Sequence, residues 1–233
     1  MINPVNKDEY FKVAIATSLV LFGFDGEDIL VLAKKKDYQP FVGAWFLPST
    51  YVKPDESLEQ CARNLLQTYT SEQSPYLEQL KAFAKVFRNP EGRVVNVSFY
   101  ALVKLEKHEV NTINESGELR WCKYNEMVDL AFDHNEIVEY AKERLKRRVK
   151  RRPVGFSLLP REFTIAQIQT LYEKALDIEL DKRNFRKKIF NSELIIETDK
   201  TTNPLNSRKV SKLYRFDVDK YEKMSLKGYD FLF

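Results

Sequence analysis

Apolar and polar positions along the first 150 residues follow two periods, and their order predicts strands and helices in alternation. Apolar runs at Phe11–Phe24 and Ile29–Ala33 meet at a Gly-Phe-Asp-Gly turn, which is typical of a β-hairpin. Residues Ser57–Tyr69 carry apolar side chains at helical spacing and predict an amphipathic helix. Two more strands are expected at Leu80–Val86 and Val94–Val103, joined by an Asn-Pro-Glu-Gly turn.

A longer helix is expected after these strands. Residues Asp133–Lys150 have an apolar stripe and end in a run of Lys and Arg, where cations interact favourably with the helix dipole. A short helical piece is expected just before it, at Asn125–Leu130. Pro153 and Gly155 then interrupt the helical pattern. We therefore predict one domain at residues 1–150 and a second at residues 151–233.

The second part is predicted to contain shorter helices and strands. Thr164 precedes the helical pattern of Ile165–Leu176 as its N-cap, and a basic helix follows at Asp181–Phe190. Strands are expected at Leu194–Thr198 and Lys212–Phe216, with a polar loop between them. Helix, turn, basic helix and hairpin in this order predict a winged helix-turn-helix domain.

The two parts differ in charge, although the 233-residue chain has a net charge of only +4. Residues 1–141 carry 15 basic and 21 acidic side chains (−6), whereas residues 142–233 carry 23 and 13 (+10). A basic module suits double-stranded DNA, because each phosphate that it neutralises releases counterions. A solvated basic surface without a partner is the alternative.

Composition excludes several classes of protein. The chain is 43% hydrophobic and 31% charged, which is a globular composition. No apolar run reaches the roughly 18 residues that a membrane-spanning helix needs, and Met1–Tyr10 lacks the pattern of a signal peptide. Cys61 and Cys122 lie in apolar patterns and are expected to be buried thiols. We therefore expect a cytoplasmic protein without a membrane partner.

The segment Leu47–Tyr69 reads LPSTYVKPDESLEQCARNLLQTY. It resembles the box of the Nudix hydrolase family, G-x5-E-x7-R-E-U-x-E-E-x-G-U, where U is bulky and aliphatic. Glu56 matches the first glutamate of this box. The resemblance covers roughly Phe11–Lys150. It implies an α/β fold, namely an α+β mixed sheet sandwiched by helices, in which a loop–helix–loop holds divalent metal on carboxylates.

This sequence departs from the box where the metal would bind. The positions of the later glutamates fall on Leu65, Thr68 and Tyr69, and the first glycine falls on Thr50. Hard cations such as Mg²⁺ need oxygen ligands, and without the metal nothing neutralises a pyrophosphate or activates water. We therefore expect no metal, no cofactor and no catalytic residues, and we expect that the chain is not an enzyme.

A Nudix-like domain without these ligands is expected to keep a ligand pocket, or to serve only as a scaffold. Alternation along Val94–Val103 puts Asn96 and Ser98 on one side of a strand, either beneath a cleft or on an edge facing water. Trp45 either stacks on a sugar or belongs to the core. Asp133 is most simply the N-cap of the long helix, and His134 is expected to have a structural and not a catalytic role. The candidate effector-binding residues are Trp45, Tyr51, Glu56, Asn96, Ser98 and Asp133.

Three separated motifs give the second part a sharper resemblance: Phe163–Glu173, Leu180–Lys188 and Leu213–Phe216. They resemble the DNA-binding domain of the Nudix-related transcriptional regulators, the NrtR-like family. That resemblance implies a bacterial repressor or regulator whose N-terminal domain senses an effector. Some members answer to ADP-ribose and control NAD metabolism, whereas a branch with decayed Nudix boxes answers to sugars such as L-arabinose. Because this box lacks its metal ligands, we expect a sugar effector.

The basic helix supports DNA binding independently of the resemblance. Its N-terminal end can enter the major groove, where Arg183 can pair with guanine and Asn184 with adenine. Phe185 and Ile189 are expected to anchor the helix in its own core. Two-fold operators are read by two-fold dimers, so a homodimer is expected. The expected DNA-binding residues are Lys182, Arg183, Asn184, Arg186, Lys187, Lys188, Arg208 and Lys209.

Three other interpretations stay open. The first is an ADP-ribose-responsive regulator, for which the cations would come from Lys34, Lys35, Lys36, Lys53, Arg88 and Arg93, unless these are simply exposed. The second is an active metal-dependent Nudix hydrolase. The third is a nucleic-acid or protein adaptor without a ligand.

Overall fold

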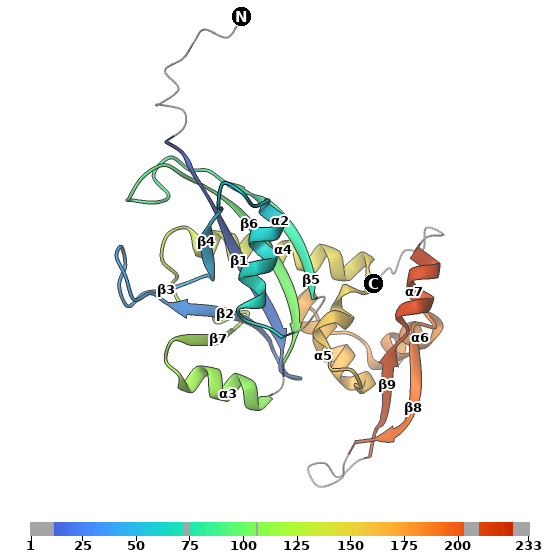
Figure 1. The fold of residues 1–233 in the computed structure, drawn as a ribbon. Helices are drawn as coiled ribbons and strands as arrows, with labels where there is room; N and C mark the ends of the chain where they lie inside the picture. Colours follow the sequence, from blue (N-terminus) through green and yellow to red (C-terminus); the bar gives the residue numbers. More distant parts are fainter. Residues whose placement is uncertain (1–11, 72–74, 106, 203–209, 226–233) are drawn as a thin grey trace, which may run out of the picture.

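The computed structural model describes residues 12–71, 75–105, 107–202 and 210–225, and it consists of a mixed sheet flanked by helices and a C-terminal winged helix domain (Figure 1). Five strands are hydrogen-bonded in the order β3-β2-β1-β6-β5, while β4 pairs with β1 and β7 with β2. β1 runs parallel to β6 and antiparallel to β2 and β4. The strands are β1 (Ala14–Phe24), β2 (Ile29–Lys35), β3 (Trp45–Phe46), β4 (Ser49–Tyr51), β5 (Tyr76–Phe83), β6 (Val94–Lys104) and β7 (Leu119–Lys123).

Alternation along the central strand β1 decides how each face of the sheet is covered. Val20, Phe22 and Phe24 belong to the hydrophobic cluster on the side of helix α4 (His134–Arg151). Leu19 and Leu21 belong to the cluster on the side of helix α2 (Leu58–Gln67). Side chains of successive residues point to opposite faces of a strand, so one apolar run supplies both layers.

The helices begin where capping residues are available. Ser57 accepts a hydrogen bond from the backbone N–H of Gln60, and the Gln60 side chain accepts one from Ser57, so α2 starts with a capping box. A further helix, α3 (Lys107–Glu115), packs against β7. The sheet sandwiched by helices confirms the expected fold class of the first part.

The second part is the expected winged helix domain. It contains a 3₁₀ helix, η1 (Pro153–Leu158), helices α5 (Ile165–Leu176), α6 (Lys182–Asn191) and α7 (Val218–Ser225), and strands β8 (Ile195–Thr201) and β9 (Lys212–Phe216). Thr164 caps α5 in a capping box with Gln167. Phe185 and Ile189 are 3% and 0% exposed, which confirms that they anchor α6.

A continuous hydrophobic cluster joins the two parts. Leu145 and Val149 of α4 belong to the same cluster as Leu171 and Tyr172 of α5. Helix α4 runs to Arg151, so the boundary predicted at residue 150 lies in its last turn and stays a prediction. Ion pairs add to the contact, since Asp28 in the β1–β2 turn binds the ammonium groups of Lys174 on α5 (2.5 Å) and Lys123 on β7 (3.3 Å).

Two predicted elements are wrong. The segment Asn125–Leu130 is a turn followed by an irregular loop and not a helix. The side chain of Asn135 satisfies the backbone of this segment: it accepts from Leu130 N–H and donates to the Val128 carbonyl. The strand expected at Leu80–Val86 instead spans Tyr76–Phe83, and Val86 lies beyond it, 59% exposed. Pairing with β6 selects the more N-terminal register.

Cys61 and Cys122 are free and buried, as expected. Among the described residues, no helix has both the length and the apolar character needed to cross a membrane.

Candidate functional site

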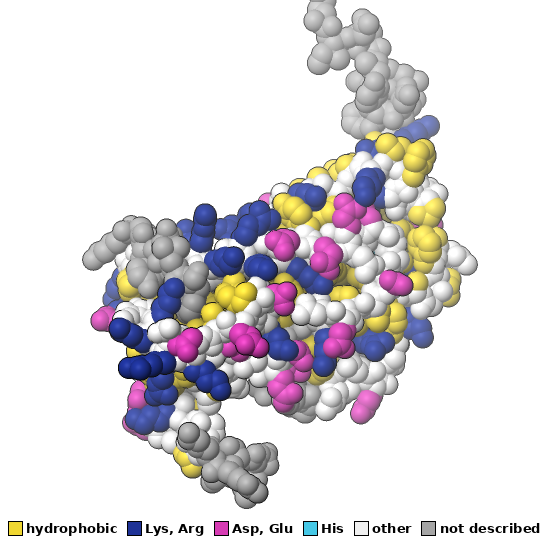
Figure 2. Space-filling model, turned by 180° about the vertical axis from the view of Figure 1, so that it is seen from behind, with side chains coloured by type: hydrophobic (Ala, Val, Ile, Leu, Met, Phe, Trp, Pro, Cys, Tyr) yellow, Lys and Arg dark blue, Asp and Glu magenta, His cyan; other side chains and the backbone are white. Residues whose placement is uncertain are grey.

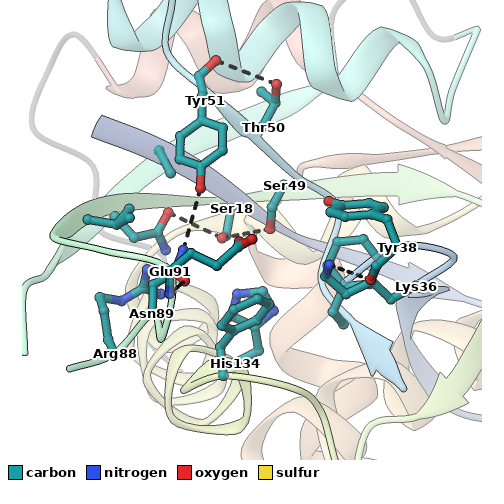
Figure 3. Close-up of a pocket in the computed structure, with 15 residues that line it drawn as sticks. Ser18, Lys36, Tyr38, Ser49, Thr50, Tyr51, Arg88, Asn89, Glu91 and His134 are labelled. Carbon is teal, nitrogen blue, oxygen red and sulfur yellow. Dashed lines mark hydrogen bonds between the residues drawn. The ribbon is translucent and has the colours of Figure 1, made fainter. Parts of the chain in front are cut away.

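A cavity of about 220 Å³ opens beside β1, between the start of β6, strand β4 and the first residue of α4 (Figure 3). Polar side chains form much of its lining, and they come from strands, from the loops after β2 and β5, and from α4. The lining residues are Ala16, Ser18, Lys36, Tyr38, Phe46, Ser49, Thr50, Tyr51, Arg88, Asn89, Glu91, Val94, Asn96, Phe132 and His134.

The floor of the cavity is a hydrogen-bonded row of hydroxyl and amide groups. The Ser18 hydroxyl donates to Asn96 Oδ1 at 3.2 Å, and it lies 2.8 Å from the Ser49 hydroxyl. Asn96 Nδ2 donates to Ser98 Oγ at 2.8 Å. Asn96 and Ser98 are fully buried, because β6 lies between β1 and β5. The polar row on β6 is therefore internal, and the alternative of a water-facing edge strand is wrong.

Arg88 and Asp133 form a buried pair at one side of the cavity. Arg88 Nε and Nη2 donate to the two carboxylate oxygens of Asp133, and the side chains are only 5% and 11% exposed. Asp133 occupies the N-cap position of α4, but its side chain makes no capping hydrogen bond. The carboxylate is used to neutralise Arg88 instead of closing the helix end, in a bidentate arrangement.

His134 lies next to this pair and is held in the neutral form. Its Nδ1 accepts a hydrogen bond from the backbone N–H of Leu47 at 3.0 Å. Burial lowers the pKa of His134 to about 3, against a smaller opposing effect of Asp133. An uncharged imidazole that fixes the β3–β4 connection is a structural group, as the sequence indicated.

Lys36 brings a second cation to the cavity, and it is 2% exposed. Its ammonium donates to the carbonyl oxygens of Tyr38 (2.8 Å) and Gln39 (3.0 Å) and lies 3.3 Å from the centroid of the Tyr38 ring. Burial lowers the pKa of Lys36, and the nearby charges of Glu91 and Asp37 raise it. Figure 3 shows Lys36 and Tyr38 together on one wall of the cavity.

The structure brings together only some of the residues expected to bind the effector. Tyr51 and Asn96 line the cavity, Ser98 supports Asn96 from behind, and Asp133 holds Arg88. Trp45 packs against the core. Glu56 lies away from the lining, where it accepts a hydrogen bond from Lys53 N–H. The role of each in ligand binding stays a prediction.

Of the six basic residues that the sequence offers as cations for ADP-ribose, Lys36 and Arg88 line this cavity and the other four do not. The burial of Lys36 depends on a loop closure, in which its backbone N–H donates to the Ala44 carbonyl and its carbonyl accepts from Gly43 N–H. Gly43 adopts a positive φ of 81° there. Pro40 and Gly43 are the sequence signals that indicate a turn in this segment.

The residues at the box positions do not fit a divalent cation. Leu65 is buried in the cluster under α2, and the Thr68 hydroxyl donates to the Leu65 carbonyl at 2.7 Å. Within the described part of the chain, no group of three or more His, Cys, Asp or Glu side chains is placed to hold a metal ion. The oxygen donors that Mg²⁺ requires are missing from these positions.

A second candidate site is the exposed face of α6. Asp181 caps the helix by accepting from Asn184 N–H, and the basic side chains behind it are exposed: Lys182, Arg183, Arg186, Lys187 and Lys188. Figure 2 shows Lys and Arg side chains gathered over the end of the molecule that the second part forms. Arg208 and Lys209, expected to contact phosphate, lie outside the described residues.

Comparison with known proteins gives matches to both parts. Residues 12–142 match the model of the NUDIX domain, and residues 155–216 match the model of the NrtR DNA-binding winged helix domain. The chain is 29% identical over 220 residues to the ADPR responsive transcriptional repressor NtrR of Acinetobacter baylyi, which covers 93% of this chain and 87% of that protein.

Two further matches are informative. An ADP-ribose pyrophosphatase of Methanocaldococcus jannaschii is 22% identical over 129 residues, covering 55% of this chain and 75% of that protein. The crystal structure of Shewanella oneidensis NrtR complexed with a 27mer DNA is similar with a TM-score of 0.78 and 27% identity, covering 94% of this chain and 97% of that one.

These matches correct two expectations. The resemblance to the sugar-sensing branch is not supported, because the relative matched over 93% of the chain is an ADPR responsive repressor. The expectation that the chain is not an enzyme is contradicted, because loss of the box glutamates was its only basis and the relatives are an ADPR responsive transcriptional repressor and an ADP-ribose pyrophosphatase.

Proposed function

Because the chain belongs to the Nudix family and carries a winged helix domain of the NrtR type, we propose that it is an ADP-ribose-responsive transcriptional repressor. The observation that carries this proposal is the match to an ADPR responsive repressor over 93% of the chain, with both domains included. A match to the Nudix part alone would support only the fold of the sensing domain.

The cavity beside β1 is the proposed effector site. Hydroxyl and amide groups on its floor suit the ribose hydroxyls, and the buried Lys36 and Arg88 suit the phosphates. A larger hollow of about 850 Å³ adjoins it and shares Arg88 and Phe132. Phe87, 93% exposed, stands on its wall and offers an aromatic face to the adenine.

Operator DNA is the proposed partner of α6. The basic side chains of this helix are exposed, its first turn contains no acidic residue, and the similar Shewanella protein was crystallised with a 27mer DNA. We expect Arg183 and Asn184 to contact base edges, and Lys187 and Lys188 to contact phosphates. Two copies of the chain reading two half-sites complete the proposal.

Helix α4 connects the proposed effector site to the DNA-binding domain. Its first residue, His134, lines the cavity, and Val149 near its other end packs in the cluster that includes α5. An occupant that moves Arg88 also acts on Asp133, its bidentate partner at the N-cap of α4. If α4 has two arrangements and the ligand binds them with different affinity, ligand binding shifts the population between them and so changes the position of the DNA-binding domain.

Thermal unfolding with a small ligand panel tests the effector. At about 100 times its Kd, ADP-ribose is expected to stabilise the chain by about 2.7 kcal/mol and to raise Tm by roughly 5–10 °C, because it binds only the folded state. L-Arabinose and free ribose at the same concentration serve as controls. A Tm that is unchanged by ADP-ribose contradicts the proposed effector, and a rise with L-arabinose alone restores the sugar interpretation.

A mobility-shift assay on the DNA upstream of the chain's own gene tests the partner. We expect a shift at low salt that an unrelated fragment of equal length does not give. The absence of any shift at low salt contradicts DNA binding.

A further inference from the structure

The cavity contains one cation whose charge is not balanced. Lys36 is 2% exposed, and in the described part of the chain it forms no ion pair, whereas Arg88 is neutralised by Asp133. A buried lysine normally loses its charge or acquires a carboxylate partner, because desolvation of an ammonium is costly. Here two backbone carbonyls and the Tyr38 ring replace that partner.

The ammonium has capacity left for a ligand. A lysine carries three N–H donors, and Lys36 uses two of them on the Tyr38 and Gln39 carbonyls. The centroid of the Phe132 ring, another lining residue, is 6.0 Å from the ammonium nitrogen. The position of the ammonium is fixed, because the backbone of Lys36 closes the loop to Gly43 and Ala44.

One acidic side chain, Glu91, also lines the cavity, and it is exposed. Its charge is screened by solvent, so it reduces the attraction of an anion without pairing with Lys36. The remaining polar lining residues are neutral or paired. The cavity therefore presents one desolvated positive charge toward its interior.

We propose that Lys36 receives the pyrophosphate of the effector in place of a divalent cation, so that ADP-ribose binds this chain without metal. The inference rests on the proposed function. The Nudix fold implies a metal bound at its box, but Leu65, Thr68 and Tyr69 offer no carboxylate to bind one. A buried ammonium can supply the positive charge that the missing metal would have supplied. A single ammonium in a region of low dielectric interacts with phosphate oxygens more strongly than an exposed one.

Isothermal titration calorimetry of the full chain with ADP-ribose tests the inference, in buffer with EDTA and in buffer with MgCl₂. We expect the same Kd in both. Lys36→Met keeps the length and apolar stem of the side chain and is expected to weaken binding by roughly tenfold to hundredfold, the size of a lost charged hydrogen bond. Lys35→Met, at the exposed neighbouring position, is the matched control and leaves Kd unchanged. Glu91→Gln is expected to tighten binding by a few-fold, because it removes the opposing charge.

Binding only with MgCl₂ overturns the inference while the proposed effector stands, and so does equal affinity of Lys36→Met and the unaltered chain. The comparison of EDTA with MgCl₂ uses the unaltered chain, so it tests binding without metal even if Lys36→Met does not fold. If ADP-ribose fails to bind in either buffer, titration with inorganic pyrophosphate tests the anion site separately from the effector. Pyrophosphate binding that Lys36→Met abolishes supports the anion site and contradicts ADP-ribose as the effector. No pyrophosphate binding contradicts both.

Discussion

The cavity beside β1 and the exposed face of α6 both carry cations, but they present them in opposite ways. Lys36 and Arg88 are buried, with fixed partners and few solvent contacts. On α6, the basic side chains from Lys182 to Lys188 are all exposed. The first arrangement selects one small anion by position, whereas the second attracts a long polyanion by the number of its charges.

Net charge by itself therefore indicates only the second kind of site. The first part has a net charge of −6, which gives no sign of the two buried cations Lys36 and Arg88, because acidic side chains outnumber basic ones there. The second part has a net charge of +10, and this excess of Lys and Arg can be counted from the sequence without knowing the fold. The two sites should therefore respond differently to salt, to point substitutions and to pH.

Salt is expected to have the largest effect. With about four phosphate contacts from α6, operator affinity should fall roughly a hundredfold between about 50 and about 200 mM salt. ADP-ribose affinity should change much less over the same range, because the charge of Lys36 is buried. Fluorescence anisotropy for DNA and calorimetry for ADP-ribose give the two slopes. Equal slopes would remove the distinction between the two sites.

Substitutions on α6 come next. Arg183→Ala is expected to weaken operator binding by roughly tenfold to hundredfold and to relax sequence preference, because a base contact is lost. Lys187→Ala should weaken binding to operator and unrelated DNA alike and lower the salt slope by about one. Competition binding with both DNAs measures this. The same loss of preference in the two variants would show that Arg183 does not read bases.

pH has a smaller and more local effect, through His134. Its pKa is lowered to about 3 by burial, so between about pH 6.5 and pH 3 the unfolded chain binds more protons and stability falls as pH falls. From about pH 6.5 to about pH 5 the loss is about 1.5 kcal/mol. His134→Asn, whose side-chain oxygen can accept from Leu47 N–H, should flatten this dependence in urea unfolding curves. An equally steep dependence in the variant would rule out His134 as its source.

Local patterns predicted much of the fold. Helix α5 has the bounds expected from Ile165–Leu176, because the Thr164–Gln167 capping box and the helical spacing lie in consecutive residues. The β1–β2 hairpin and β6 follow equally from periodicity. The turn at Asn125–Leu130 could not be predicted, since it depends on the side chain of Asn135 beyond the segment.

The candidate site was predicted less completely than the fold. Asn96 followed from alternation within one strand, and it lines the cavity. The bidentate pair of Arg88 with Asp133 joins residues 45 positions apart, and no local pattern indicates such a contact. The wall around Lys36 depends on the closure of the 36–44 loop, which is likewise absent from the periodicity that predicts strands and helices.

The central claim is that occupancy of the cavity controls the affinity of α6 for operator DNA. Its most direct test is the anisotropy of a labelled DNA fragment from upstream of the chain's own gene, titrated with the full chain at increasing ADP-ribose. We expect the apparent Kd for DNA to change by at least about fivefold and to reach a plateau at the ADP-ribose concentration where calorimetry shows the cavity filled. DNA should change ADP-ribose affinity by the same factor. A DNA affinity that stays constant while the cavity fills would contradict it.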